Sequence, residues 1–310
     1  MPQADLARRL SAMAAAGGSS IAVGSSVAAS TVILAYPWFA GQALRYALGA
    51  VLLVLLLHRR LPRLRLAQVP RLLGLAAVGM AGFNIFLMAA LQQADAGTVG
   101  AIVGGVPVAL ALLGPLLRGE RPVLRAVVAA VIVSGGAALV KYAGPADTTP
   151  AGIALAVAAL LCEVGFSALA LSLLRELGPA GVATYGSAAS ALMLGAASLA
   201  VEGPAALRPP TTAEGAALAY LAVVVTAAAF LLWYTALTVL PVETAGLFAG
   251  LVPVAALGAS ALVGAIGMTL PRILGILVVA GGVVLGATRS RRPPRSARVR
   301  SATAAHHHDT

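Results

Sequence analysis

The sequence has little charge, one cysteine and few histidines, and each shortage excludes a class of protein. Only 10% of its 310 residues are charged, whereas a water-soluble domain carries about a quarter. The single cysteine, Cys162, excludes an intramolecular disulfide and a cysteine-rich metal site. His58 is the only histidine outside the terminal run His306–His308, to which we assign no role. We therefore predict no metal site and no cofactor.

Apolar residues take the place of the missing charges. They make up 60% of the chain, and the mean hydropathy is +0.96. Because a bilayer core about 30 Å thick needs about 20 apolar residues per helix, ten membrane-spanning helices fit the sequence. The expected spans are 11–33, 37–57, 70–91, 96–117, 124–143, 151–172, 180–201, 214–237, 243–265 and 271–288. The predicted fold class is an all-α integral membrane protein that occupies a lipid bilayer.

The basic residues indicate how these helices are oriented. A net charge of +11 would suggest nucleic-acid binding in a soluble protein, but in a membrane protein the distribution of charge matters more. With residues 1–10 inside, seventeen of the 21 basic residues lie at inner connections, and only Lys141, Arg208 and Arg272 lie outside. This bias predicts two cytoplasmic termini, a basic cytoplasmic tail over 289–310, and no nucleic-acid partner. Twenty of the basic residues are arginine, which favours a GC-rich bacterial source and the bacterial inner (cytoplasmic) membrane.

The chain contains an internal repeat with a period of 146 residues. The stretch 90–109, ALQQADAGTVGAIVGGVPVA, aligns without a gap with 236–255, ALTVLPVETAGLFAGLVPVA, and nine of twenty residues match. A division at the connecting loop 144–150 leaves five expected helices in 11–143 and five in 151–288. Because five is odd, the second half must enter the membrane in the opposite orientation. We therefore predict two inverted-topology five-helix repeats, with a binding site near the midplane between them.

The order of short motifs resembles a known family. The first half contains AAL (89–91), VPV (106–108), RGER (118–121) and GG (135–136), and the second half has TAL (235–237), VPV (252–254) and GG (281–282). This arrangement resembles the EamA family of the drug/metabolite transporter (DMT) superfamily over about 11–288. The resemblance implies ten helices around a central cavity and export of amino acids, related metabolites or toxic compounds. The chain departs from the family where Ala265 and Ile266 replace the Gly-Glu that the first half has at 119–120.

Two charged residues lie within expected membrane helices and are candidates for substrate or proton binding. Glu163 lies about twelve residues into the sixth helix, near the membrane midplane, where a charge must face protein or water. Its carboxyl would bind a coupling proton or a cation, or would serve as a structural group between helices. Arg45 in the second helix would pair with Glu163 or bind an anionic substrate group, or would extend to the outer interface.

Other candidates are prolines and large polar or aromatic residues in apolar segments. Pro107 and Pro253 lie within the matched fourth and ninth helices, where we expect either a hinge beside the cavity or a static kink. Asn84, Trp233 and Tyr234 would line the cavity or pack between helices.

These observations predict a secondary transporter, an exporter that moves a small-molecule substrate, a polar metabolite such as an amino acid, by alternating access. No GxxxxGK[ST] loop is present, so we expect an ion gradient or the substrate gradient to supply the energy. A lipid-handling or structural membrane protein is the alternative. A membrane-embedded enzyme fits less well, because the sequence has no nucleophile–base pair or acidic cluster. Substrate, coupling ion, direction and oligomeric state stay open.

Overall fold

A computed structural model describes residues 3–33, 35–94, 96–141, 148–262 and 269–287. Within these ranges every regular element is a helix and there is no strand, which confirms the all-α prediction. The tail 289–310, with His306–His308, and Ala265 and Ile266 lie outside the described residues, as does most of the connection 144–150.

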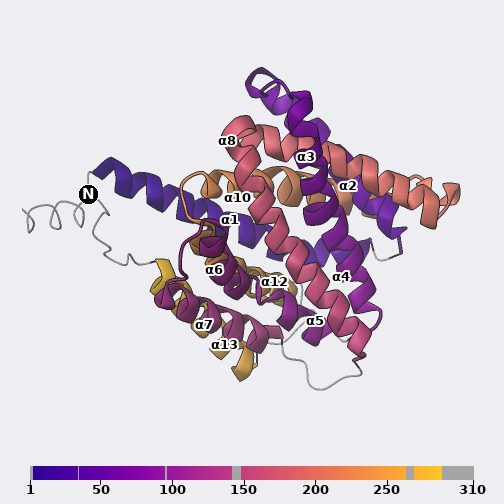
Figure 1. The fold of residues 1–310 in the computed structure, drawn as a ribbon. Helices are drawn as coiled ribbons and strands as arrows, with labels where there is room; N and C mark the ends of the chain where they lie inside the picture. The colour runs from indigo at the N-terminus through magenta and orange to yellow at the C-terminus, as the bar shows by residue number, and fades with distance from the viewer. Residues whose placement is uncertain (1–2, 34, 95, 142–147, 263–268, 288–310) are drawn as a thin grey trace, which may run out of the picture.

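The first part of the chain forms seven α-helices joined by short 3₁₀ and π segments (Figure 1). Their bounds are α1 Gln3–Val32, α2 Trp38–Leu57, η1 His58–Arg60, η2 Leu66–Gln68, α3 Val69–Leu75, η3 Ala76–Gly82, α4 Phe83–Leu91, α5 Ala96–Val103, α6 Val106–Leu117 and α7 Leu124–Lys141. In the order α3, η3 and α4 the helical path continues through a π turn, so these three elements cover one apolar stretch.

The second part begins with the longest helix. Its elements are α8 Pro150–Val201, η4 Pro204–Leu207, α9 Thr212–Tyr220, η5 Leu221–Ala228, α10 Ala229–Leu237, α11 Val242–Leu247, η6 Phe248–Gly250, α12 Leu251–Leu262 and α13 Leu270–Ala287. Polar caps define the helix starts: Thr149 accepts a hydrogen bond from the Gly152 N–H at 3.0 Å, and Thr211 and Glu214 form a reciprocal capping box.

Several of these helices are suited to a bilayer. Six helical stretches within the described ranges are long and apolar enough to cross a membrane, and two shorter apolar helices accompany them. The six are Trp38–Arg60, Leu66–Leu91, Thr98–Leu116, Pro150–Val201, Thr212–Leu237 and Val242–Ala259, and the shorter two are Leu124–Val140 and Leu270–Gly286. The serine- and glycine-containing α1, which covers the expected first span, is not among them.

Helix α8 corrects one expected connection. We expected helices over 151–172 and 180–201 joined by residues 173–179, but helical structure continues as far as a kink at Gly178. Gly178 has φ 62° and ψ 174°, a conformation that only glycine adopts readily, and Pro179 follows it. The two arms of α8 diverge sharply at this point (Figure 1). The connection is thus a single bend rather than a seven-residue loop.

Backbone features recur with the same 146-residue period as the sequence. Leu124–Lys141 (α7) corresponds to Leu270–Ala287 (α13), and Phe83–Leu91 (α4) corresponds to Ala229–Leu237 (α10). The π segments Ala76–Gly82 and Leu221–Ala228 also occupy matching positions. Because a π turn is rare, its recurrence in register is a stronger sign of duplication than apolar composition alone.

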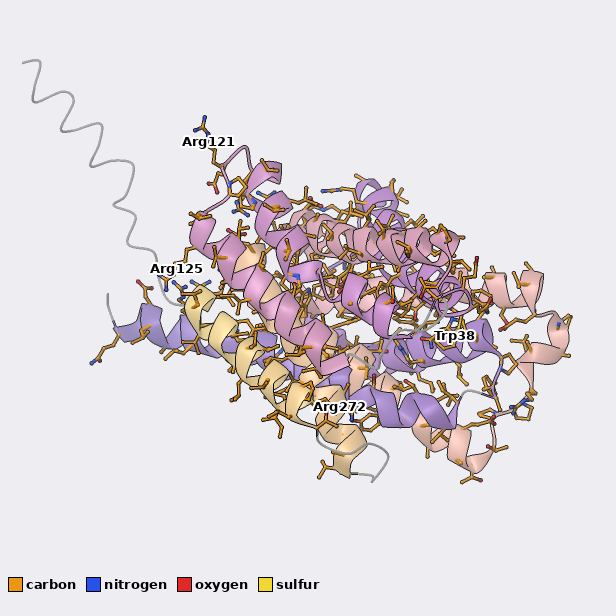
Figure 2. All side chains as sticks on the ribbon, turned by 90° about the horizontal axis from the view of Figure 1, so that it is seen from below. Trp38, Arg121, Arg125 and Arg272 are labelled. Atoms are coloured by element: carbon orange, nitrogen blue, oxygen red, sulfur yellow. The ribbon has the colours of Figure 1, made fainter. Side chains whose placement is uncertain are left out.

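The matched helices α7 and α13 pack closely and run antiparallel. A Cβ added at Gly136 would lie 2.8 Å from the Val279 backbone nitrogen, and one added at Gly282 would lie 3.0 Å from that of Val133. These two contacts are equivalent, because Gly136 and Gly282 are 146 positions apart and so are Val133 and Val279. Figure 2 places Arg125, near the start of α7, and Arg272, near the start of α13, at opposite ends of the pair. The contact therefore has the form of a twofold, self-complementary interface.

The main hydrophobic core brings α2, α8 and α10 together. Its fully buried members include Leu53, Leu173, Leu194 and Tyr234. Helix α2 packs along α8, and α10 packs against both α1 and α8. This arrangement places residues from both sequence repeats around the centre of the helix bundle.

Candidate functional site

Four aromatic rings meet where α2, α8 and α10 pack together. Phe166 lies 5.8 Å from Phe230 and 5.6 Å from Tyr234 between ring centroids, and Phe230 lies 6.0 Å from Tyr234. Tyr46 of α2 extends the group through its 6.2 Å contact with Phe230. These separations fall in the range of favourable tilted aromatic contacts. We call Tyr46, Phe166, Phe230 and Tyr234 the central aromatic cluster.

Two of the predicted site residues reach this cluster through Tyr46. The Asn84 side-chain amide donates to the Met80 carbonyl at 2.6 Å and lies 3.4 Å from the Tyr46 hydroxyl. The Arg45 guanidinium carbon lies 4.6 Å from the centre of the Tyr46 ring, in cation–π range. The same guanidinium donates through Nε to Thr226 Oγ1 at 3.1 Å. Arg45 and Asn84 are therefore both fixed beside one tyrosine.

Glu163 approaches the cluster from α8. It lies on this helix one turn before Phe166, a member of the cluster. Its side chain is half-buried and takes part in no hydrogen bond or ion pair within the described residues. The structure does not form the suggested pair with Arg45, whose Nε donates to Thr226 on the segment preceding α10. The structure thus leaves one carboxyl and one guanidinium beside the same rings without joining them.

Some buried polar atoms around the cluster have no partner within the described protein. The Tyr234 hydroxyl is the central example, since the side chain is fully buried. Trp233 Nε1 and Ser167 Oγ are also unpartnered, although no ring contact joins Trp233 to the cluster. A buried polar group without a hydrogen bond costs about 1–3 kcal/mol. These atoms therefore leave hydrogen-bonding capacity at the centre of the bundle that water or a polar ligand would satisfy.

The two candidate prolines do not lie in mid-helix, and this corrects the expected position. The fourth expected span is interrupted at Gly104–Gly105, and Pro107 lies in the first turn of α6. Pro253 likewise lies in the first turn of α12, directly after the 3₁₀ segment η6. Proline is well tolerated there because the first-turn N–H groups have no helical partner. The interruption recurs in both repeats. The conserved element of the fourth and ninth spans is therefore the helix break, and the proline only follows it.

Arg118 and Glu243 form an ion pair at the end of α6 that the predicted topology places in the cytoplasm. Arg118 Nη2 lies 2.8 Å from Glu243 Oε1, and Nη1 lies 3.2 Å from Oε2. Burial of Arg118 lowers the pKa of its guanidinium, but the hydrogen bonds to Glu243 and Glu120 outweigh this effect and leave that pKa raised. A second pair, Arg71–Glu176 at 2.7 Å, joins two other inner segments.

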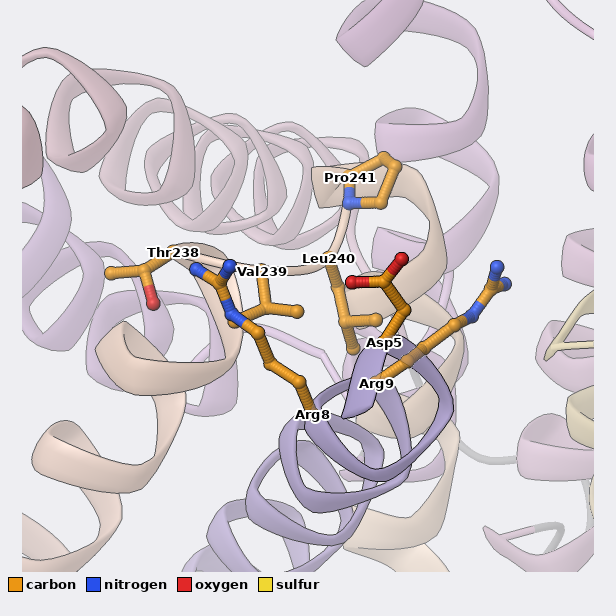
Figure 3. Close-up of a pocket in the computed structure, with 7 residues that line it drawn as sticks. All are labelled: Asp5, Arg8, Arg9, Thr238, Val239, Leu240 and Pro241. Atoms are coloured by element: carbon orange, nitrogen blue, oxygen red, sulfur yellow. The ribbon is translucent and has the colours of Figure 1, made fainter. Parts of the chain in front are cut away.

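A surface pocket of about 520 Å³ lies beside the first turns of α1. Figure 3 shows Asp5, Arg8 and Arg9 facing the connection Thr238–Pro241 across it. Both walls come from segments that the predicted topology assigns to the cytoplasm. None of the predicted substrate residues lines this pocket, so it is separate from the central aromatic cluster.

Sequence reasoning did not assign Phe166, Phe230 and Thr226 to the site. Two local signals point to the rings: Phe166 follows Glu163 by one turn, and Phe230 precedes Tyr234 by four residues. Thr226 has no such signal, because its contact with Arg45 joins positions 181 residues apart.

The fold and site define a multi-pass α-helical membrane protein with a polar and aromatic centre between two repeated segments. The EamA-like transporter family model matches the chain twice, over residues 10–142 and 150–288. The chain therefore belongs to the EamA-like transporter family, and it is a membrane transporter of the drug/metabolite type.

Two further comparisons agree with this assignment. The chain is 25% identical over 292 residues to the uncharacterized transporter YetK of Bacillus subtilis (strain 168), covering 92% of this chain and 87% of YetK. A solved structure described only as "Crystal structure of protein" superposes with a TM-score of 0.76 at 21% identity, over 91% of this chain and 99% of that one. The second likeness concerns the fold alone.

Proposed function

We propose that this transporter exports a small polar metabolite, such as an amino acid or related compound, from the bacterial cytoplasm by alternating access. Its ten helices form two inverted five-helix repeats, over 11–143 and 151–288, in the inner membrane with both termini cytoplasmic. The in-register recurrence of helix bounds and the antiparallel packing of α7 on α13 support this layout.

One observation carries the proposed binding site: Arg45 contacts Tyr46 of the central aromatic cluster, Glu163 precedes Phe166 of that cluster by one helical turn, and the two charges are not paired with each other. Opposite charges held apart beside a shared apolar surface suit a substrate that carries both an amino and a carboxylate group. The cluster would cover the apolar part of that substrate, while Asn84 and the Tyr234 hydroxyl supply hydrogen bonds.

Glu163 is the proposed coupling group. A carboxyl inside an apolar helix bundle can hold a proton in one state and release it when substrate or water reaches it. Exchange of a proton for an amino group at the same carboxylate would couple proton entry to substrate exit. The interruptions at Gly104–Gly105 and at η6 supply the backbone breaks around which α6 and α12 reorient.

Flux measurements in proteoliposomes test this proposal. The wild type is expected to move protons when pools of amino acids and related metabolites are supplied, and Glu163→Gln is expected to lose that flux by at least about tenfold. Asp5→Asn is the matched control, because Asp5 is an exposed carboxylate in the first turn of α1, outside the central cluster. Substrate uptake that is equal in wild type and Glu163→Gln, without proton movement, would reject Glu163 as the coupling group. Lipid movement without flux of any pool would favour the lipid-handling alternative.

A further inference from the structure

Within the described residues, the fourth and ninth spans pack on each other at one end. Helix α6, the inner half of the fourth span, packs on α11 and η6, the inner part of the ninth. The outer halves pack elsewhere: α5 lies against α7 and α8, and α12 lies against α1 and α7. In the described part of the chain α5 and α12 are not packed on each other. The two spans therefore converge on the predicted cytoplasmic side and separate toward the outside.

The convergent end is closely packed. A Cβ added at Gly246 would lie 2.8 Å from Leu110 Cδ1, and one added at Gly114 would lie 2.8 Å from Val242 Cγ1. Glycine at both positions lets the two helices approach closely. The Arg118–Glu243 ion pair lies directly beyond this crossing. The Glu243 side chain is only 15% exposed, so the pair is shielded more than an ordinary surface salt bridge.

The internal repeat places uncharged residues at the positions equivalent to the two partners of this ion pair. With the 146-residue period, Arg118 corresponds to Gly264 and Glu243 corresponds to Gly97. In an inverted repeat these two glycines belong to the outer ends of the same two spans. A charged contact therefore holds one side of the pathway, whereas the positions equivalent to Arg118 and Glu243 on the opposite side carry no charge.

We infer that Arg118 and Glu243 form a cytoplasmic gate that closes the pathway between the two repeats and biases the resting transporter toward an outward-open state. The bidentate geometry of the pair gives the closed gate a defined orientation. Opening toward the cytoplasm requires both groups to separate, after which each regains contact with water. This inference rests on the proposed alternating-access function and adds its conformational control.

Cysteine labelling tests the gate without any substrate. The single native cysteine makes Cys162→Ser a cysteine-free background for the full chain. Leu110→Cys, which is 2% exposed between α6 and α11, reports on the inner side, and Ala256→Cys, its repeat counterpart on α12, reports on the outer side. A membrane-impermeant maleimide is applied to inside-out and right-side-out vesicles, so that each face is sampled separately.

Glu243→Gln and Arg118→Gln are expected to raise cytoplasmic labelling of position 110 at least about fivefold and to slow outer labelling of position 256. The exchanged pair Arg118→Glu/Glu243→Arg should restore both rates. Arg71→Gln removes a different ion pair, Arg71–Glu176, on the predicted cytoplasmic side and should change neither rate. Either single variant that accumulates suffices for the test.

Unchanged labelling in the single variants would overturn the gate, and so would faster labelling at both positions, which indicates general loosening. Failure of the flux experiment leaves these labelling rates interpretable, because they need no substrate. Conversely, normal wild-type flux with unchanged labelling removes the gate and keeps the proposed function.

Discussion

Helices α6 and α12 occupy equivalent places in the two repeats, yet their surroundings differ. Helix α6 ends at Leu117 beside Arg118, which binds Glu243, whereas the residue that corresponds to Arg118 is Gly264. Both helices begin after a backbone interruption and carry proline in the first turn. The duplication therefore preserves backbone shape more strictly than side-chain chemistry. Such a difference gives the inward-open and outward-open states different energies, whereas two identical halves would give the two states equal energies.

We expect the largest loss of thermal stability at the α7–α13 contact, where the two halves pack closely against each other. Gly136→Ala places a methyl group within 2.9 Å of backbone atoms of Gly275 and Val279, which cannot move without shifting α13. Overpacking of this kind costs about 1–3 kcal/mol, so thermal unfolding in detergent should occur at a lower temperature.

The neighbouring Gly135→Ala is a matched control, because nothing lies within 4 Å of its added Cβ. It should be neutral or stabilise the helix by up to about 1 kcal/mol. Equal melting temperatures for the two variants would contradict the close α7–α13 contact.

A smaller change in stability distinguishes a tyrosine hydroxyl that binds substrate from one that holds the fold together. Tyr185 donates to the Pro62 carbonyl at 2.7 Å, so Tyr185→Phe should lose about 1 kcal/mol of stability and keep its transport rate. Tyr234→Phe removes a buried hydroxyl without a protein partner and should leave stability unchanged or slightly raised.

If the Tyr234 hydroxyl binds substrate, the apparent affinity of Tyr234→Phe should fall while its melting temperature holds. Flux titrations and thermal unfolding on the same two preparations distinguish these results. A Tyr234→Phe protein with wild-type affinity would remove Tyr234 from the binding site.

Much of the fold could be predicted from the sequence, because membrane helices have a length and polarity that a single chain displays. The repeat was visible in 90–109 and 236–255, and the family model matches both halves. The π segments and the single bend at Gly178 were not predicted, since each depends on how α8 and its neighbours pack. The Gly178–Pro179 pair marks a break locally, but it does not show that the break is one bend and not a loop.

The candidate site was predictable only in part. A charge in an apolar run identifies Glu163 and Arg45 as unusual, because lipid disfavours both. Their partners depend on distances between helices, which no single sequence contains. Arg45 contacts Thr226 and Asn84 reaches Tyr46, and neither of these contacts was predicted.

The α7–α13 contact also has a consequence for movement. Gly136 contacts Val279 in the same way that Gly282 contacts Val133. If the two halves exchange conformations, this contact is therefore unchanged. An inward-open state and an outward-open state can therefore share it unchanged. The α7–α13 pair would stay fixed during the transport cycle, while the other helices of the two halves exchange conformations.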